Sequence, residues 1–426
     1  MKKIESLFTE PASRTAFLLL LLALLARIIC VLVQQDSVGD PDSAEYLALA
    51  QSIRFHGVFS FGGPHSWGSS PPLNGHGPFL PTDARAPLYP LLIAALWWNA
   101  APPIFAVQIV QVGLGATVCV LTYLIALSLT NYRAALFAGI ITAFAPLSSF
   151  MTAAIMSETL FTFLLILGFW FWSRKRGLLA GIIFGAAALT RPIVLPFVIL
   201  IAISAAILKF NRGMHARIAL GAFLIIVPWT VRNLATQNAL VPIQTQGWAA
   251  NLFLGTVDIP YGANSNQWMN FQADPAFRSI VSSSETETDA ERRMLSAALN
   301  RIRTDPSRWL RTRVKEFPRL FADSGMYLVP FIPLSPRLIK FIMLGSSFLF
   351  LGLAGVGMIA MRKNWRQFYF VGAFPIFMCC IQFPVYGEPR FMIPAFPLLA
   401  IFASIPLANF SWGQKLHHGL APSDAG

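Results

Sequence analysis

The sequence predicts an all-α protein that crosses a membrane many times. Of its 426 residues, 55% are hydrophobic and only 12% are charged, which is too few polar side chains to cover the surface of a soluble domain. Long apolar runs follow one another along the chain, and a run of roughly 20 residues crosses about 30 Å of hydrocarbon as a helix. Short basic clusters separate alternate runs, as in polytopic membrane proteins. We therefore expect a polytopic α-helical membrane protein with about ten transmembrane helices.

The expected spans follow the apolar runs. We interpret the first as an anchor rather than a signal peptide, because it lacks a clear small-x-small cleavage site. The four cysteines lie within apolar runs at no metal-binding spacing, so the sequence predicts no disulfide framework. The spans are placed at residues 16–33, 104–129, 135–151, 159–173, 178–190, 193–208, 217–231, 338–360, 367–384 and 391–408.

The basic clusters predict the topology. The positive-inside rule places them on the cytoplasmic side, which puts both termini there and accounts for the net charge of +13 without nucleic acid as a partner. Membrane lipids are the partners that such clusters meet. The clusters are Lys2 and Lys3, Arg133, Arg174 to Arg176, Lys209 to Arg217, Arg362 to Arg366, and Lys415.

Two long segments then lie on the outer side, and the second is rich in arginine. Loops beyond about 60 residues cross a membrane largely regardless of their charge, so this segment does not violate the rule. The expected divisions are an N-terminus with the first span (1–33), a catalytic outer loop (34–103), a transmembrane core (104–231), a second outer loop (232–337), C-terminal spans (338–408) and a cytoplasmic tail (409–426).

The second outer loop contains a helical pattern of apolar residues. This pattern predicts an amphipathic helix lying on the outer membrane surface. Its basic face is either solvated or in contact with a lipid substrate. The apolar residues are Met294, Leu295, Ala298, Leu299 and Ile302.

The stretch GDPDSAEYLALAQSIRFHG, residues 39–57, predicts a short helix at the outer interface. Its apolar residues fall on one helical stripe, but the stretch is too short and polar to span. Asp40 fits the N-cap and Pro41 the first helical position, where a missing N–H has no cost. Asp42 and Glu45 then have carboxylates that either serve a site or favour the helix dipole.

Glu158, in MSETLFTFLL, stands at the outer junction of two spans with apolar residues on both sides. An ionisable group in such a place is a functional candidate. The alternative is an interfacial helix capped by Ser157 with Glu158 in its first turn. Arginines gather on the same side, and four of them together suit a lipid phosphate, although each alone could be a snorkelling side chain. They are Arg85, Arg191, Arg232 and Arg390.

These stretches resemble the polyprenyl-phosphate-sugar-dependent glycosyltransferases of the GT-C fold, and are similar to protein O-mannosyltransferases and lipid A aminoarabinose transferases. The resemblance runs from about residue 14 to 408 and implies juxtamembrane helices at 40–55 and 87–99. It is carried by DPDSAEYLALAQSI, RAPLYPLLIAAL, MSETLFTFLL, GAAALTRPIVLP, PWTVRNLATQNALVPIQTQGWAANLFLG and YGEPRFMIPAFPLL.

The resemblance implies an inverting transfer of a sugar from a polyprenyl-phosphate donor through an oxocarbenium-like transition state. Asp42 matches the acidic catalytic position and is the expected general base. Arg85 is expected to bind the donor phosphate, with Arg390 and Arg191 as further candidates. Glu158 matches a second acid that would orient the acceptor or bind a cation.

The remaining expected site residues have less defined roles. Tyr46, Glu45 and Arg232 are expected near the substrate, with holding the long loop as the alternative for Arg232. Asp40 is a helix cap or a secondary acid.

The chain departs from the family pattern where a metal would bind. Ser43 follows Asp42 where many O-mannosyltransferases have Glu, and Ala84 precedes Arg85 where the aminoarabinose type has an acid; Asp83 is one residue earlier. His65 and His76 lack an HxxxH spacing. No metal ligand is assigned, and a divalent cation is the one cofactor left open.

The acceptor is a glycan, a lipid or a protein, and the expected location is a bacterial inner membrane with the site on the periplasmic face. Two other functions remain as alternatives. A ligase or polymerase would use a lipid-diphosphate donor. A secondary transporter would show repeats and charges at the bilayer midplane, and the sequence shows neither. A non-enzymatic scaffold has no need for the acids.

Overall fold

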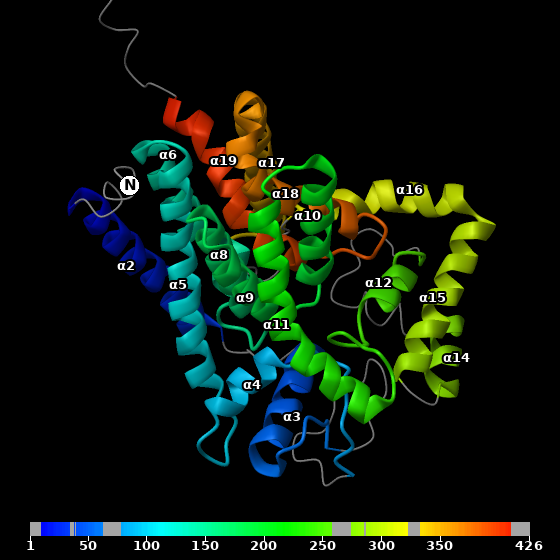
Figure 1. Cartoon of the computed structure of the whole chain (residues 1–426). Helices are drawn as coiled ribbons and strands as arrows, with labels where there is room; N and C mark the ends of the chain where they lie inside the picture. The colour runs from blue at the N-terminus through cyan, green and yellow to red at the C-terminus, as the bar shows by residue number, and fades with distance from the viewer. Residues whose placement is uncertain are drawn as a thin grey trace, which may run out of the picture.

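The computed structural model describes residues 10–34, 38, 40–62, 78–257, 274–284, 287–322 and 333–409. All regular structure in these residues is helical, which confirms the expected fold class (Figure 1). His65 and His76 lie outside the described residues.

Helices of the bundle overlap every expected span. Five segments, Pro11–Val33, Ile104–Leu129, Arg212–Gln237, Pro336–Ala360 and Pro389–Asn409, are long and apolar enough to cross a membrane, so the chain is an integral membrane protein. The bundle helices are α2 (Glu10–Val33), α5 (Ile104–Leu129), α6 (Tyr132–Ala143), α7 (Pro146–Phe150), α8 (Glu158–Ser173), α9 (Gly177–Ala188), α10 (Val194–Leu208), α11 (Arg212–Gln237), α17 (Pro336–Ala360), η3 (Arg362–Asn364), α18 (Trp365–Gln382), η4 (Pro389–Ala395) and α19 (Phe396–Asn409).

Two expected spans are broken. The span at 135–151 ends as α6 at Ala143, and Pro146 starts the short α7, because proline cannot donate a helical hydrogen bond to the preceding turn. Residues 151–157 are then non-helical before α8 begins. The last span opens as the 3-10 helix η4, which contains Pro394, and continues as α19.

Close packing of α9 on α11 depends on glycine. A Cβ on Gly181 would lie 2.1 Å from the carbonyl oxygen of Ile218, and one on Gly221 would lie 2.5 Å from that of Leu178. Small residues let membrane helices approach to backbone contact. This pair therefore fixes the loop between α9 and α10, which carries Arg191.

Helices α3 (Pro41–His56) and α4 (Leu88–Ala95) pack together at one end of the bundle, opposite the end where α6 begins and α19 finishes (Figure 1). Asp40 caps α3 as expected: its Oδ1 accepts from the Asp42 amide at 2.9 Å, and Pro41 opens the helix. Helix α4 ends earlier than the expected 87–99, because its last turn tightens, with the Trp97 amide donating to the Ala94 carbonyl.

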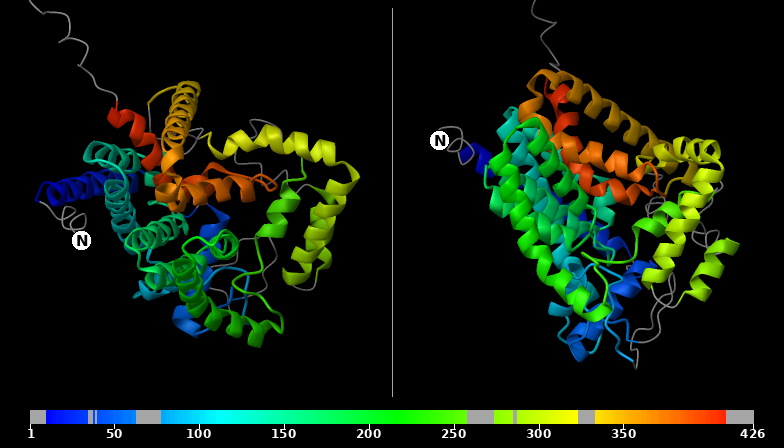
Figure 2. Two further views of the ribbon diagram at one scale, coloured as in Figure 1. Left: turned by 45° about the horizontal axis from the view of Figure 1, so that its top comes forward. Right: turned by 45° about the vertical axis from the view of Figure 1, so that its right-hand side comes forward.

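A second core lies beside the bundle, formed by α12 (Trp248–Leu254), α14 (Pro275–Ser283), α15 (Glu287–Thr304) and residues 385–386 (Figure 2). These three helices, together with α16 (Pro306–Glu316) and η2 (Phe317–Leu320), are called the outer bundle. The expected membrane-surface role of the 294–302 stripe is wrong for its central residues. Met294 and Ala298 are fully buried against Phe253 and Phe277 rather than facing lipid. The helix also ends at Thr304, because Asp305 caps a new helix.

The outer bundle is fastened to residues 383–388, the stretch that precedes Arg390. The Tyr386 amide donates to the Asn251 carbonyl at 2.9 Å, and Arg313 Nη1 donates to the Val385 carbonyl at 2.7 Å. The stretch is therefore held from α12 on one side and α16 on the other.

Candidate active site

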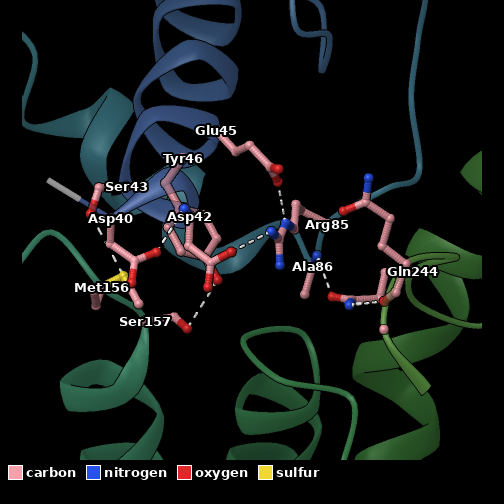
Figure 3. A network of polar contacts seen from close by, with 12 residues as sticks. Asp40, Asp42, Ser43, Glu45, Tyr46, Arg85, Ala86, Met156, Ser157 and Gln244 are labelled. Carbon is pink, nitrogen blue, oxygen red and sulfur yellow. Dashed lines mark hydrogen bonds and ion pairs between the residues drawn. The ribbon is translucent and has the colours of Figure 1, made fainter. Parts of the chain in front are cut away.

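Helix α3 presents two acids on one face because positions three apart are neighbours on a helix. Asp42 lies in its first turn and Glu45 one turn later, and both reach Arg85 in the loop before α4 (Figure 3). Arg85 Nη2 donates to Asp42 Oδ1 at 2.6 Å, and Arg85 Nε donates to Glu45 Oε2 at 2.5 Å. Glu45 therefore pairs with Arg85 instead of only favouring the helix dipole.

Arg390 reaches the other oxygen of Asp42. Its Nη1 lies 3.4 Å from Asp42 Oδ2 and 3.3 Å from Asp40 Oδ2, while its Nε donates to Glu388 Oε2 at 2.6 Å. Asp42 is thus held between two guanidinium groups that come from distant parts of the chain. With 26% of its side chain exposed, it keeps access for a substrate.

This arrangement keeps Asp42 ionised. Burial opposes its negative charge, but the charges of Arg85, Arg390 and Arg191 outweigh burial and lower the pKa of Asp42 to about 2. Asp40 behaves differently. Burial raises the pKa of Asp40, and repulsion from Asp42 and Glu388 adds to that rise against the attraction of Arg390.

Glu158 and Arg191 form a second pair beside the first. Glu158 is almost completely buried, and its Oε1 lies 2.6 Å from Arg191 Nη1. The Arg191 guanidinium lies 5.7 Å from the centre of the Phe391 ring, and that of Arg390 lies 5.6 Å from the same ring. Two cations thus lie near one aromatic ring. Arg191, with 27% of its side chain exposed, has one carboxylate partner among the residues that the structure describes.

Tyr46 links the two pairs. Its hydroxyl lies 3.1 Å from Ser157 Oγ (Figure 3), and its ring is 5.7 Å from the Arg85 guanidinium. The Ser157 side chain makes no capping hydrogen bond to α8. Ser157 is the N-cap residue of α8 and Glu158 stands in its first turn, as the alternative had it, but the Ser157 side chain bonds to Tyr46 and not to the helix.

Arg232 holds the loop that leads to Arg85. Its Nη1 donates to the Thr82 carbonyl at 2.6 Å, and its guanidinium lies 4.8 Å from the centre of the Trp229 ring. The structure therefore brings Arg232 to the loop rather than to Asp42. Asp83 also bonds within its own surroundings: its Oδ1 accepts from Thr245 Oγ1 at 3.1 Å. It therefore does not take the place of the acid that the aminoarabinose transferases have directly before the arginine.

Two site residues escaped sequence reasoning. Glu388 lies two residues before Arg390 in YGEPR, and its Oε1 accepts from the Tyr386 hydroxyl at 3.2 Å. Its charge and its closeness to Arg390 in the sequence are the features that could have identified it. Gln244 accepts from the Ala86 amide at 2.8 Å (Figure 3), and no local pattern singles it out.

The residues present do not form an evident cation site. Within the described ranges, no three or more His, Cys, Asp or Glu side chains are grouped to hold a metal ion. The acids instead pair with arginines.

Comparison with known proteins rests on structure. No protein-family model and no curated protein matches the sequence. An oligosaccharyltransferase from Archaeoglobus fulgidus, solved with zinc and sulfate, matches at a TM-score of 0.50 and 13% identity, over 92% of this chain and 49% of that one. The same organism's oligosaccharyltransferase AglB, with an inhibitory peptide and a dolichol-phosphate, matches at 0.49 and 13% identity, over 94% and 51%.

ArnT from Cupriavidus metallidurans, bound to undecaprenyl phosphate, matches at a TM-score of 0.42 and 12% identity, over 92% of this chain and 78% of that one. The chain spans about half the length of the oligosaccharyltransferases. At these identities the likeness shows the fold alone, and the fold of this chain is the GT-C fold of membrane glycosyltransferases.

Proposed function

We propose that the protein is an inverting glycosyltransferase that moves a sugar from a polyprenyl-phosphate donor to an acceptor hydroxyl. The observation that carries the proposal is the ionised Asp42 held between Arg85 and Arg390. A base and phosphate-binding cations on one site are what this reaction requires. The site would lie on the periplasmic face of a bacterial inner membrane, with the termini in the cytoplasm.

The donor phosphate is assigned first to Arg191 and then to Arg390. Among the described residues Arg191 has one carboxylate partner, whereas Arg85 has two and Arg390 contacts three. Arg390 is included because it and Arg191 lie 5.6 and 5.7 Å from the centre of the same Phe391 ring, and an anion bound by two neighbouring cations relieves their repulsion. Arg85 then mainly holds Asp42, and Glu158 holds Arg191.

The reaction is a single displacement. The acceptor oxygen forms a bond to the anomeric carbon while the bond from that carbon to the phosphate oxygen breaks. The electron pair stays on the phosphate, where the arginines stabilise the growing charge, and Asp42 takes the acceptor proton. One displacement without a covalent intermediate inverts the anomeric centre.

With its low pKa, Asp42 is a weak base in the free enzyme, and its strength as a base depends on the donor. Bound phosphate shares the charges of Arg390 and Arg191, so their hold on Asp42 weakens and the pKa of Asp42 rises. Its basicity therefore increases when a donor is present.

The test uses purified protein in liposomes together with polyprenyl-monophosphate sugars, a lipid-diphosphate glycan and an envelope-glycan extract as acceptor. We expect consumption of a monophosphate donor and a matching sugar mass on an acceptor by mass spectrometry. Asp42→Asn should lower turnover by about a thousandfold or more while the lipid still binds.

Asp40→Asn is the matched control. Asn caps helices about as well as Asp, so this variant should retain most of its activity. Consumption of the diphosphate donor alone, or full activity of Asp42→Asn, would contradict the proposal.

A further inference from the structure

The non-helical residues 151–157 lie inside the bundle, where their backbone needs hydrogen-bond partners. Two side-chain amides on one face of α5 supply them. Gln108 Nε2 donates to the Ala153 carbonyl at 2.8 Å, and Gln111 Nε2 donates to the carbonyls of Thr152 and Ala154 at 3.0 and 2.8 Å. Three successive carbonyls are thereby satisfied, which is the condition for irregular backbone in a membrane protein.

Gln111 also contacts α4. Its Oε1 accepts from the Tyr89 hydroxyl at 3.0 Å, and the Tyr89 ring packs edge-on against Tyr46 at 4.9 Å between centroids. The Tyr46 hydroxyl in turn meets Ser157 Oγ at 3.1 Å. The contacts therefore form a closed ring that starts at Gln111, passes through α4 and α3, and returns to residues 151–157 immediately before Glu158.

Every residue of this ring is buried: Tyr46, Tyr89, Gln111 and Ser157. An amide is the side chain that offers two donors and an acceptor from one group. Leucine would remove the donor to the Thr152 carbonyl, one of two donors to the Ala154 carbonyl, which also accepts from the Met156 amide, and the acceptor of the Tyr89 hydroxyl. An ionised glutamate has no donor.

We propose that Gln111 is a positioning residue for the sugar transfer, which fixes residues 151–157, and with them Glu158, relative to the helix of Asp42. This inference rests on the proposed function. Gln111 touches no reacting atom; it acts through Tyr89, Tyr46 and the backbone that ends at Glu158.

The main variant is Gln111→Met, which keeps the side-chain length but removes the amide. We expect turnover to fall about tenfold or more. The KM for the donor should rise by a smaller factor, because a displaced Glu158 disturbs Arg191 but leaves Arg390 in place. Tyr89→Phe removes one hydroxyl only and should lower turnover by about threefold. It is the gentler variant should Gln111→Met fold poorly.

Thr122→Val is the matched control on the same helix. It removes a buried hydroxyl that bonds within α5, at 2.8 Å to the Val118 carbonyl, and should change turnover by less than about twofold. In a Glu158→Gln background, Gln111→Met should cause little further loss, because both changes act on the same placement. Additive losses would overturn the proposal.

A thiol-labelling measurement is independent of turnover. Met156 is buried, so Met156→Cys, in a chain whose native cysteines are replaced, should react slowly with a thiol reagent. Gln111→Met should speed this labelling about fivefold, and Thr122→Val should not. A Met156→Cys parent that labels slowly but transfers no sugar overturns the proposed function. A Gln111→Met protein that labels and turns over at the parent rate overturns the positioning role alone.

Discussion

At the scale of single residues, the charges around Asp42 decide what the site can do. Asp42 has a guanidinium on each oxygen, and Asp40 and Glu388 share Arg390 with it. A carboxylate in this position stays ionised far below neutral pH. Under the proposed function, its strength as a base then depends on what else binds the arginines.

The first prediction concerns pH. The pKa of about 2 for Asp42 predicts that kcat/KM, which reports free enzyme, loses no activity through Asp42 until the pH approaches that value. In the donor complex the pKa rises, so the acid limb of kcat should lie at a higher pH, by about one unit or more. Parallel pH profiles of kcat and kcat/KM check this, and coincident acid limbs would contradict it.

The same shift affects stability. The pKa of Asp42 in the folded protein, about 2, is below the ordinary 3.8. Its pairing therefore stabilises the fold above the ordinary pKa, and this contribution is lost as the pH falls towards 2. Asp42→Asn should remove that part of the acid dependence of thermal unfolding.

The second prediction concerns Arg85. Arg85→Lys keeps the charge but cannot reach Asp42 and Glu45 with the same fork, so turnover should fall in part. Arg85→Ala removes one of the two guanidinium partners of Asp42 and the Arg85 pair of Glu45, and should cost about 2–4 kcal/mol in transition-state stabilisation. Turnover at equal protein in the membrane should rank Arg, then Lys, then Ala. Equal activity of the Lys variant would reduce Arg85 to an interfacial anchor.

At the scale of elements, local patterns predicted what each segment forms but not what it touches. Asp40 and Pro41 were sufficient to place the start of α3, because capping is a local interaction. The break after α6 escaped prediction, although Pro146 marks it in the sequence. What no local pattern could indicate is that Gln108 and Gln111 of α5 satisfy the carbonyls of residues 152–154.

The stripe on α15 shows the same limit. Periodicity correctly marked a face that must be covered, but it could not tell a membrane from α12 and α14. The site residues show this limit as well, because they lie in six separated stretches of the sequence. Asp42, Arg85 and Arg390 could be nominated from the sequence, whereas their pairing joins residues 43 and 348 positions apart.

The third prediction tests the stripe. Met294 is fully buried, so Met294→Ala should lower the free energy of unfolding by about 2–4 kcal/mol. Leu299, which is 37% exposed, is the control, and Leu299→Ala should cost less than about 1 kcal/mol. Thermal unfolding in detergent measures both. A stripe that faced lipid would give two small and similar effects.

At the scale of the whole molecule, the site lies at one end of the bundle. Helices α3 and α4 gather there, while the turns after α8 and α17 lie towards the opposite end (Figure 1). The positive-inside rule assigns the basic turns to the cytoplasm, so the acids and arginines of the site are expected outside.

The fourth prediction tests this orientation. Single cysteines at Ser283 and Gly387 should react with an impermeant reagent from outside intact cells, and cysteines at Lys175 and Lys363 should not. Labelling after permeabilisation is the control for reactivity. Outside labelling at position 175 would invert the predicted topology.

Residues 383–388 have a mechanical consequence for the molecule. They are bonded to Asn251 and Arg313 of the outer bundle, and they continue directly into Glu388 and Arg390 beside Asp42. A displacement of the outer bundle would therefore reach Arg390, which contacts Asp42, along a few residues of backbone. The outer bundle and Arg390 are thus mechanically connected through a short segment, so a force on the outer bundle would also move Arg390.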